Sequence, residues 1–236
     1  MRSMVDQMSA RGYKFTSLDD PSPNTVTVTF DDGYHNNTLF DDLSRSMGVP
    51  YIIFVSAYYT LSGEPYPWLA DGGQNYHQMH NFDFYARLSS KTNEAQMEQA
   101  YSWDRPMNFD ELAALSSSEL MEVGCHGYYH QPLSETFEKY LDQELDSSMS
   151  LFQEKLAVQP RYFALPNGIY NKQVVRRLLN TFDKVLTIDG MPFKSSDRVV
   201  HRVNLTNPNI SGPLIQQIDK NLILLRQLRR AFRTKK

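Results

Sequence analysis

Two adjacent carboxylates, Asp31 and Asp32, follow a run of alternating β-branched residues at 25–30 (TVTVTF) and precede Gly33. At the end of an apolar strand, two neighbouring carboxylates repel each other and lose hydration, and a bound cation would relieve both penalties. Asp-Asp-Gly is also favourable turn chemistry. The dipeptide alone therefore leaves two interpretations open, a cation site and a solvated turn.

Two histidines four residues apart, His126 and His130, follow a second apolar run at 121–125. At this spacing both rings can lie on one face of a helical turn and point at one ion. With Asp32 they form a set of two histidines and one carboxylate, which leaves positions open for water and substrate and is typical of catalytic metal sites. The alternative is two unrelated histidines, one of them buried and hydrogen-bonded.

Strands and helices must bring these distant residues together. The sequence predicts strands at 25–30, 50–57, 121–125, 161–166, 184–188 and 198–205. It predicts helices at 3–13, 39–47, 108–116, 134–156, 171–180 and 213–232, with a capping box from Asn108 and Glu111 and an N-cap at Ser134. This alternation favours an α/β fold with a parallel sheet and crossover helices, in which active sites lie at the C-terminal ends of the strands.

The composition is that of a globular protein. The chain has 236 residues, 41% of them hydrophobic, which suits a single domain over 1–236. A net charge of −3 argues against a general nucleic-acid binder. One cysteine excludes an internal disulfide. Because neither a signal peptide nor an apolar span of ~18 residues stands out, we expect a cytoplasmic protein.

Together these residues resemble three motifs of the polysaccharide deacetylase family, the NodB-homology domain of carbohydrate esterase family 4. Residues 29–33 (TFDDG) are similar to the first motif, and residues 126–130 (HGYYH) to the second, His-(Ser/Thr)-x-x-His. Residues 163–168 (FALPNG) are similar to the third, an aromatic followed by a Pro-Tyr-Gly turn. The resemblance covers residues 4–205 and implies a distorted (β/α) barrel with fewer than eight complete units.

The resemblance also implies a role for each motif residue. Asp31 would be the general base, and Asp32, His126 and His130 would bind a divalent metal ion. Zinc is the expected metal, with cobalt, nickel and manganese as alternatives. The metal would lower the pKa of a bound water towards ~7 and polarise the acetyl carbonyl, while Asp31 would take the proton of the water.

Three positions depart from the family pattern. Gly127 stands where Ser or Thr is common, and because that hydroxyl is not a ligand we expect little effect. Asn167 replaces the usual Tyr beside Pro166; both would line the substrate site, and the Asn167 N–H would help to hold the oxyanion. Ala164 stands where many members have an arginine that orients the base, and Arg161 is the candidate substitute.

Two further substrate-site residues are predicted. The leaving amine needs a general acid, which the family commonly supplies as a His from a late Leu-x-x-His motif. That motif is missing, and His201 in the strand at 198–205 is the candidate, with a structural histidine as the alternative. Trp68 lies in an aromatic-rich insertion at about 60–108, which either stacks on sugar rings or forms a satellite core.

We therefore predict a metal-dependent hydrolase that removes the N-acetyl group from an amino sugar of a glycan or glycan precursor, nucleotide-linked or lipid-linked. The family favours a role in surface polysaccharide biosynthesis, such as O-antigen (lipopolysaccharide) or capsule. A basic amphipathic helix at about 213–236 either covers the barrel or contacts the inner membrane peripherally. The alternative functions are a catalytically weak metal-containing carbohydrate-binding relative and an amide hydrolase with a non-sugar substrate.

Overall fold

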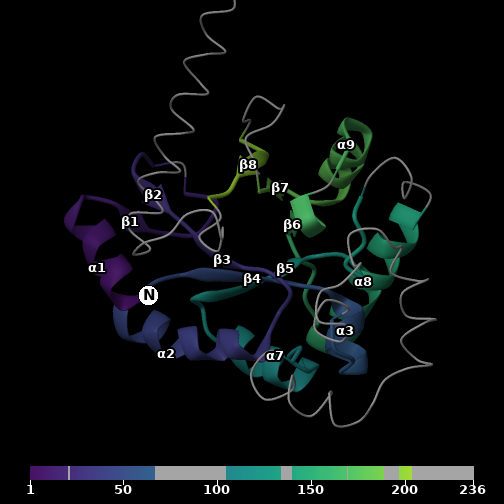
Figure 1. Cartoon of the computed structure of the whole chain (residues 1–236), viewed down its shortest axis with the longest axis horizontal. Coiled ribbons are helices and arrows are strands. Elements are labelled where there is room, and N and C mark those ends of the chain that lie inside the picture. Colours follow the sequence, from purple (N-terminus) through teal and green to yellow (C-terminus); the bar gives the residue numbers. More distant parts are fainter. Residues whose placement is uncertain (21, 67–104, 134–139, 169, 189–196, 204–236) are drawn as a thin grey trace, which may run out of the picture.

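The computed structural model describes residues 1–20, 22–66, 105–133, 140–168, 170–188 and 197–203 (Figure 1). Its helices are α1 (Arg2–Ala10), α2 (Thr38–Met47), α3 (Ala57–Ser62), α7 (Phe109–Ser116), α8 (Leu141–Leu156) and α9 (Lys172–Thr181), with 3-10 turns η1 (His35–Asn37) and η4 (Pro166–Gly168). Its strands are β1 (Lys14–Phe15), β2 (Thr25–Val26), β3 (Val28–Phe30), β4 (Tyr51–Val55), β5 (Met121–Cys125), β6 (Tyr162–Ala164), β7 (Lys184–Thr187) and β8 (Val199–His201).

Six of the strands form one sheet in the order β3-β4-β5-β6-β7-β8, and every neighbouring pair is parallel. Strand order therefore follows chain order, as expected when each strand is joined to the next by a crossover connection on the same side. Parallel strands also place all their carboxyl ends at one edge of the sheet. The predicted α/β class with a parallel sheet is confirmed.

The sheet curls, with one small and one large hydrophobic face. Side chains of alternate strand residues meet on the inner face in a compact cluster of Ile52, Phe54, Tyr162, Ala164 and Leu186. The intervening residues face outward into the main core beneath the helices, among them Ile53, Val55, Val123, Cys125, Phe163 and Val185. A residue that follows a strand therefore points either to the inner face or towards the helices, according to its place in this alternation.

The two edge strands of the sheet come together. Arg202, which follows β8, makes two hydrogen bonds to Asp31, which follows β3. In a flat sheet these strands would be about 24 Å apart, because neighbouring strands are spaced by about 4.8 Å. A side-chain contact between them requires the sheet to close most of the way round, so the predicted distorted barrel is confirmed.

The run at 25–30, predicted as one strand, serves two sheets. Its first part is β2, which pairs with β1, and its second part is β3, which pairs with β4. Thr27 lies between the two strands, and its hydroxyl group donates a hydrogen bond to the Thr16 carbonyl. The chain thus changes partners two residues before the motif that contains Asp31.

Most of the other predicted elements agree with the structure. Strand 121–125 is β5, and the predicted capping box at the start of α7 is present, with Asn108 accepting from the Glu111 N–H and Glu111 accepting from the Asn108 N–H. The predicted strand at 161–166 is shorter, since residues 166–168 turn as η4. Ser134 and the helix at 213–232 lie outside the described residues. In the described part of the chain, no helix is long and apolar enough to span a membrane.

Candidate active site

The end of β3 places two carboxylates in different directions. Thr29 and Asp31 share the inner face, whereas Phe30 packs against the outer core. Asp32 then takes a left-handed backbone conformation, with φ of 72°, followed by Gly33 at 75°. Such a conformation costs a residue other than glycine about 1–3 kcal/mol and is most often found at functional sites. It sends the Asp32 side chain away from Asp31 and towards β5.

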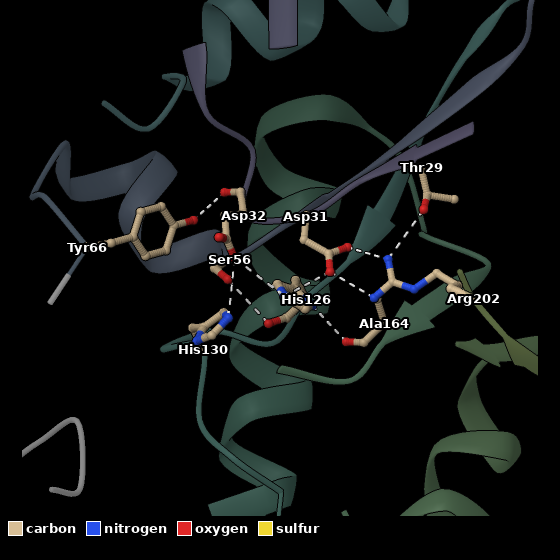
Figure 2. Close-up of polar contacts among 9 residues, drawn as sticks. All are labelled: Thr29, Asp31, Asp32, Ser56, Tyr66, His126, His130, Ala164 and Arg202. Carbon is tan, nitrogen blue, oxygen red and sulfur yellow. Dashed lines mark hydrogen bonds and ion pairs between the residues drawn. The ribbon is translucent and has the colours of Figure 1, made fainter. Parts of the chain in front are cut away.

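Asp32, His126 and His130 converge, and each offers a ligand atom within 4.8 Å of the others (Figure 2). The Asp32 Oδ1 atom lies 3.4 Å from His126 Nε2 and 3.2 Å from His130 Nε2. Both histidines are buried, and His130, like Asp32, has a positive φ, at 56°. The backbone is therefore held in an unfavourable conformation at two of the three positions, which brings the three ligand atoms together.

A divalent cation fits the chemistry of this cluster. Asp32 Oδ1 is buried and, among the described residues, has no hydrogen-bond partner. A buried oxygen without a partner costs free energy that a cation would recover. Two imidazole nitrogens and one carboxylate oxygen are donors that zinc and related transition ions prefer. The predicted set of Asp32, His126 and His130 can therefore hold such an ion.

The hydrogen bonds around His126 select the tautomer that a metal needs. Its Nδ1 lies 2.8 Å from the Ala164 carbonyl, and because a carbonyl only accepts, Nδ1 carries the proton (Figure 2). In the neutral ring the lone pair is then on Nε2, the atom that faces Asp32. The backbone on either side is also fixed, since Ser56 donates to the His126 carbonyl and the His126 N–H donates to Val55. A carbonyl behind a ligating histidine is a common feature of metal sites.

Electrostatics favour an ionised Asp32 and a neutral His130. Burial on its own would raise the pKa of Asp32, but the neighbouring imidazoles of His130 and His126 outweigh it and hold that pKa well below its ordinary value. Burial lowers the pKa of His130, and the neighbouring carboxylates offset this only in part. Both residues are thus in the protonation state in which they bind a metal.

Asp31 forms a separate pair with Arg202. The two Nη atoms donate to the two carboxylate oxygens at 2.5 and 2.8 Å, and Nη1 also lies 3.4 Å from Thr29 Oγ1 (Figure 2). Burial would raise the pKa of Asp31, but the charges of Arg202 and His126 reverse the shift, so that this pKa is lowered. Asp31 Oδ2 is 4.0 Å from His126 Nε2. An ionised, oriented carboxylate therefore lies directly beside the metal-binding cluster.

The prediction that Arg161 orients the base Asp31 is wrong. It precedes β6, at the amino end of the sheet, whereas Asp31 follows the carboxyl end of β3. There it is half exposed and forms ion pairs of 2.7 Å with Asp19 and 2.9 Å with Asp183. A substrate-binding role for Arg161 fails for the same reason. Trp68, the other predicted substrate contact, lies outside the described residues.

His201 is not brought to the cluster either. His201 is two residues after Val199 in β8, so its side chain is on the same face of the sheet as that of Val199, which packs in the outer core. Its Nδ1 is 2.6 Å from Thr187 Oγ1. Arg202, one residue further on, faces inward to Asp31. Because successive side chains of a strand point to opposite faces, the His201 ring lies on the other side of the sheet from Asp31. This geometry does not support the predicted general acid.

The third motif lies beside the histidine loop. Pro166 is buried, and its Cγ would be 3.9 Å from a Cβ placed on Gly127. Asn167 has a φ of 55°, a left-handed conformation that asparagine tolerates better than most residues. The turn therefore directly adjoins the metal-binding cluster, while oxyanion binding by the Asn167 N–H stays a prediction.

Sequence reasoning missed two residues of the site, Arg202 and Tyr66. The Tyr66 hydroxyl donates to the Asp32 carbonyl, and its ring centroid lies 6.2 Å from that of His130 (Figure 2). Tyr66 is fully buried, so this residue of the aromatic-rich segment belongs to the core. Arg202 could have been suspected from the strand alternation, since it must face the opposite side from His201. No sequence signal distinguished Tyr66 from its aromatic neighbours.

Comparison with known proteins shows which family the chain resembles in sequence and in structure. Residues 19–182 match the family described as polysaccharide deacetylase. No curated protein sequence matches the chain. Among solved structures it resembles IcaB from Ammonifex degensii, with a TM-score of 0.61 and 18% identity over 87% of this chain and 82% of that one.

Two other structures are similar to the same extent. The deacetylase domain of BpsB from Bordetella bronchiseptica gives a TM-score of 0.62 and 16% identity over 86% of this chain and 83% of that one. A de-N-acetylase from Aggregatibacter actinomycetemcomitans gives 0.60 and 16% over 92% and 86%. At these identities the structures establish the fold, and the sequence match spans more than half of the chain. The chain belongs to the polysaccharide deacetylase family.

Proposed function

We propose that this protein is a metal-dependent hydrolase that removes the N-acetyl group from an amino sugar of a glycan or glycan precursor. One observation carries the proposal: Asp32, His126 and His130 converge on one point, and a second carboxylate, Asp31, is held ionised beside them by Arg202. The two carboxylates thus have different environments and can have different roles.

Asp31 is suited to act as the general base. Its lowered pKa keeps it ionised near neutral pH, and its two bonds to Arg202 fix the plane of the carboxylate. A carboxylate held in this way can accept the proton of an attacking water. A divalent ion bound by Asp32, His126 and His130 would polarise the acetyl carbonyl and activate that water. We propose zinc, which suits nitrogen and oxygen donors.

We propose that Asp31 also returns the proton to the leaving amine. Since His201 faces away, Asp31 is the described side chain beside the cluster that holds the proton after the attack. Its low pKa makes the protonated carboxyl a good donor. We propose that the same group passes this proton to the nitrogen as the C–N bond breaks, so that the amine leaves neutral together with acetic acid, which then ionises to acetate in solution.

The pairing of Asp31 with Arg202 favours an enzyme over a carbohydrate-binding relative. Ala164 stands where the family commonly has its base-orienting arginine, and a chain without such an arginine would be a weaker catalyst. Arg202 supplies a guanidinium to Asp31 from a different strand. An ionised, oriented carboxylate beside a metal site is the arrangement that general-base catalysis requires.

The nature of the sugar carrier is a further proposal. Family membership supports an N-acetylated sugar as substrate. We propose a precursor in surface polysaccharide biosynthesis, nucleotide-linked or lipid-linked, such as one for O-antigen or capsule. A cytoplasmic location and peripheral membrane contact through residues 213–236 stay predictions of the sequence.

Acetate release tests the proposal. The protein, loaded with zinc or cobalt, is mixed with N-acetylated glycans and nucleotide sugars, and acetate is measured. We expect turnover in the wild type, at least a hundredfold less in Asp31→Asn with metal content unchanged, and loss of both metal and turnover in Asp32→Asn. Full activity of Asp31→Asn, or no acetate from any substrate with wild-type protein that contains metal, would reject the proposed enzyme.

A further inference from the structure

The loop between the two predicted metal-binding histidines is short and irregular. Residues 127–129 join His126 to His130, and the backbone has positive φ at Gly127, 81°, and at His130, 56°. The two imidazole centroids are nevertheless held 4.8 Å apart, with their planes inclined at 72°. A loop of this kind lacks the internal hydrogen bonds of a helix, so other parts of the chain must fix its conformation. The start of α3 binds its carbonyls, since the Ala57 and Tyr58 N–H groups donate to Gly127 and Tyr128, but the loop N–H groups need an acceptor from elsewhere.

A buried carboxylate from α8 meets this loop. Glu144 is 2% exposed, although it lies in the first turn of α8, distant in sequence from the histidines. Its Oε2 accepts hydrogen bonds from the backbone N–H of Tyr128 at 2.7 Å and of Tyr129 at 3.0 Å. One oxygen atom thus binds two consecutive backbone donors of the loop.

A buried carboxylate at this position has a cost, which its hydrogen bonds to the loop offset only in part. Burial raises the pKa of Glu144 to about 7, and the two N–H groups offset that rise only partly. The neighbouring buried residues on this helix are mostly apolar, among them Leu141, Leu145 and Leu151. A leucine at position 144 would avoid the desolvation cost but would leave two backbone donors of the loop without acceptors.

The glycine of the loop is matched to the same carboxylate. A Cβ on Gly127 would lie 2.9 Å from Glu144 Oε2, closer than van der Waals contact allows. The family commonly has Ser or Thr at this position. Here a side chain at position 127 would require the Glu144 carboxylate to move, which would disturb the hydrogen bonds that it accepts from the loop.

We infer that Glu144 is a positioning residue that fixes loop 127–129 and thereby sets the geometry of the two metal-binding imidazoles. This inference rests on the proposed function, because it assumes that His126 and His130 bind a metal ion. Glu144 acts through the backbone of the loop.

Two substitutions of similar size separate this role from simple packing. Glu144→Gln keeps an oxygen in the position of Oε2, whereas Glu144→Met fills the space without an acceptor. We expect the dissociation constant for Co²⁺ to rise about 10–100-fold in Glu144→Met, as for other residues that orient metal ligands, and to stay within about threefold in Glu144→Gln. The visible spectrum of bound Co²⁺ should change in the Met variant and match wild type in the Gln variant.

A second variant keeps the test decisive if Glu144→Met does not fold. Gly127→Ala leaves Glu144 in place but forces the loop away from it, so Co²⁺ binding should weaken. The loss of Co²⁺ affinity caused by Gly127→Ala should be smaller in a Glu144→Ala background than in the wild type, because Glu144→Ala leaves space for the added methyl group. The strain of an alanine at positive φ is common to both backgrounds and cancels.

The outcomes distinguish this inference from the proposed function. Unchanged Co²⁺ affinity and spectrum in a folded Glu144→Met variant, or equal effects of Gly127→Ala in the two backgrounds, would overturn the positioning role and leave the metal site intact. If the wild type binds no Co²⁺, the proposed function itself fails.

Discussion

The guanidinium group of Arg202 is held in a defined orientation relative to the Asp31 carboxylate. Both Nη atoms bond to Asp31, and the guanidinium carbon lies 5.5 Å from the centroid of the Phe54 ring. Its side chain is 12% exposed, so the pair is shielded from much of the solvent. Since burial alone would raise the pKa of Asp31, the ionisation of the proposed base depends chiefly on this arginine, with a smaller contribution from His126.

Replacing Arg202 should therefore alter the pH dependence of turnover. In Arg202→Met the pKa of Asp31 should rise, because the effect of burial is then opposed less strongly, by His126 without the arginine. The base must be ionised, so the acidic limb of the kcat/KM profile should move to higher pH by about 1–3 units. Arg202→Lys keeps the charge but not the paired geometry, and its limb should lie in between. Metal content should not change, and an unshifted limb in the Met variant would contradict the assigned pairing.

At the scale of one element, α8 combines a stabilising apolar face with a destabilising charge. Its buried residues include Leu145 and Phe152, which pack in the main core, and Glu144, whose carboxylate bonds to the histidine loop. The pKa of Glu144 is raised to about 7 from an ordinary value of 4.5. A raised carboxyl pKa means that the folded protein resists ionisation more than the unfolded chain does.

This difference predicts how stability should change with pH. Below pH 4.5 Glu144 is protonated in both states and costs nothing; as pH rises towards 7 the unfolded chain ionises first, and folding stability falls. Relative to Glu144→Gln, which does not ionise, the wild type should lose on the order of 3 kcal/mol across this window, and no more above it. Urea unfolding of both proteins between pH 4 and 8 measures the loss. A constant difference would show that Glu144 titrates normally.

At the scale of the whole molecule, the site joins segments that are far apart in the chain. Asp32 follows β3, His126 and His130 follow β5, and Arg202 follows β8 at the other edge of the sheet. A metal ion bound at the cluster would link the ends of two strands, while Asp31 and Arg202 hold the edges of the barrel together. Metal binding should therefore stabilise the fold as a whole.

Thermal unfolding can measure this coupling. Zinc at a hundred times its dissociation constant should stabilise the folded state by about 2.7 kcal/mol, which corresponds to an increase in Tm of about 5–10 °C for a chain of this size. The increase should disappear in His126→Ala and with a chelator. His201→Ala is the matched control, because His201 lies on the other face of the sheet and its replacement should leave the increase intact. Loss of the zinc effect in His201→Ala would contradict this placement.

The sequence determined the parts of this protein that local chemistry encodes. The alternation of strands and helices indicated a parallel sheet, and the strand ends marked Asp31, Asp32, His126 and His130 as neighbours. These inferences succeeded because strand periodicity and parallel topology place the carboxyl ends of the strands at one edge. The capping box of α7 was equally local and was also predicted correctly.

Only the tertiary structure decided which other side chains serve these residues. His201 and Arg202 are adjacent, and which of them faces inward depends on the register of β8 against β7. Arg161 was excluded by the direction of β6, and Glu144 was revealed by the packing of α8 against a loop distant in sequence. Register and helix packing arise from contacts between distant segments, and no local pattern in the chain records them.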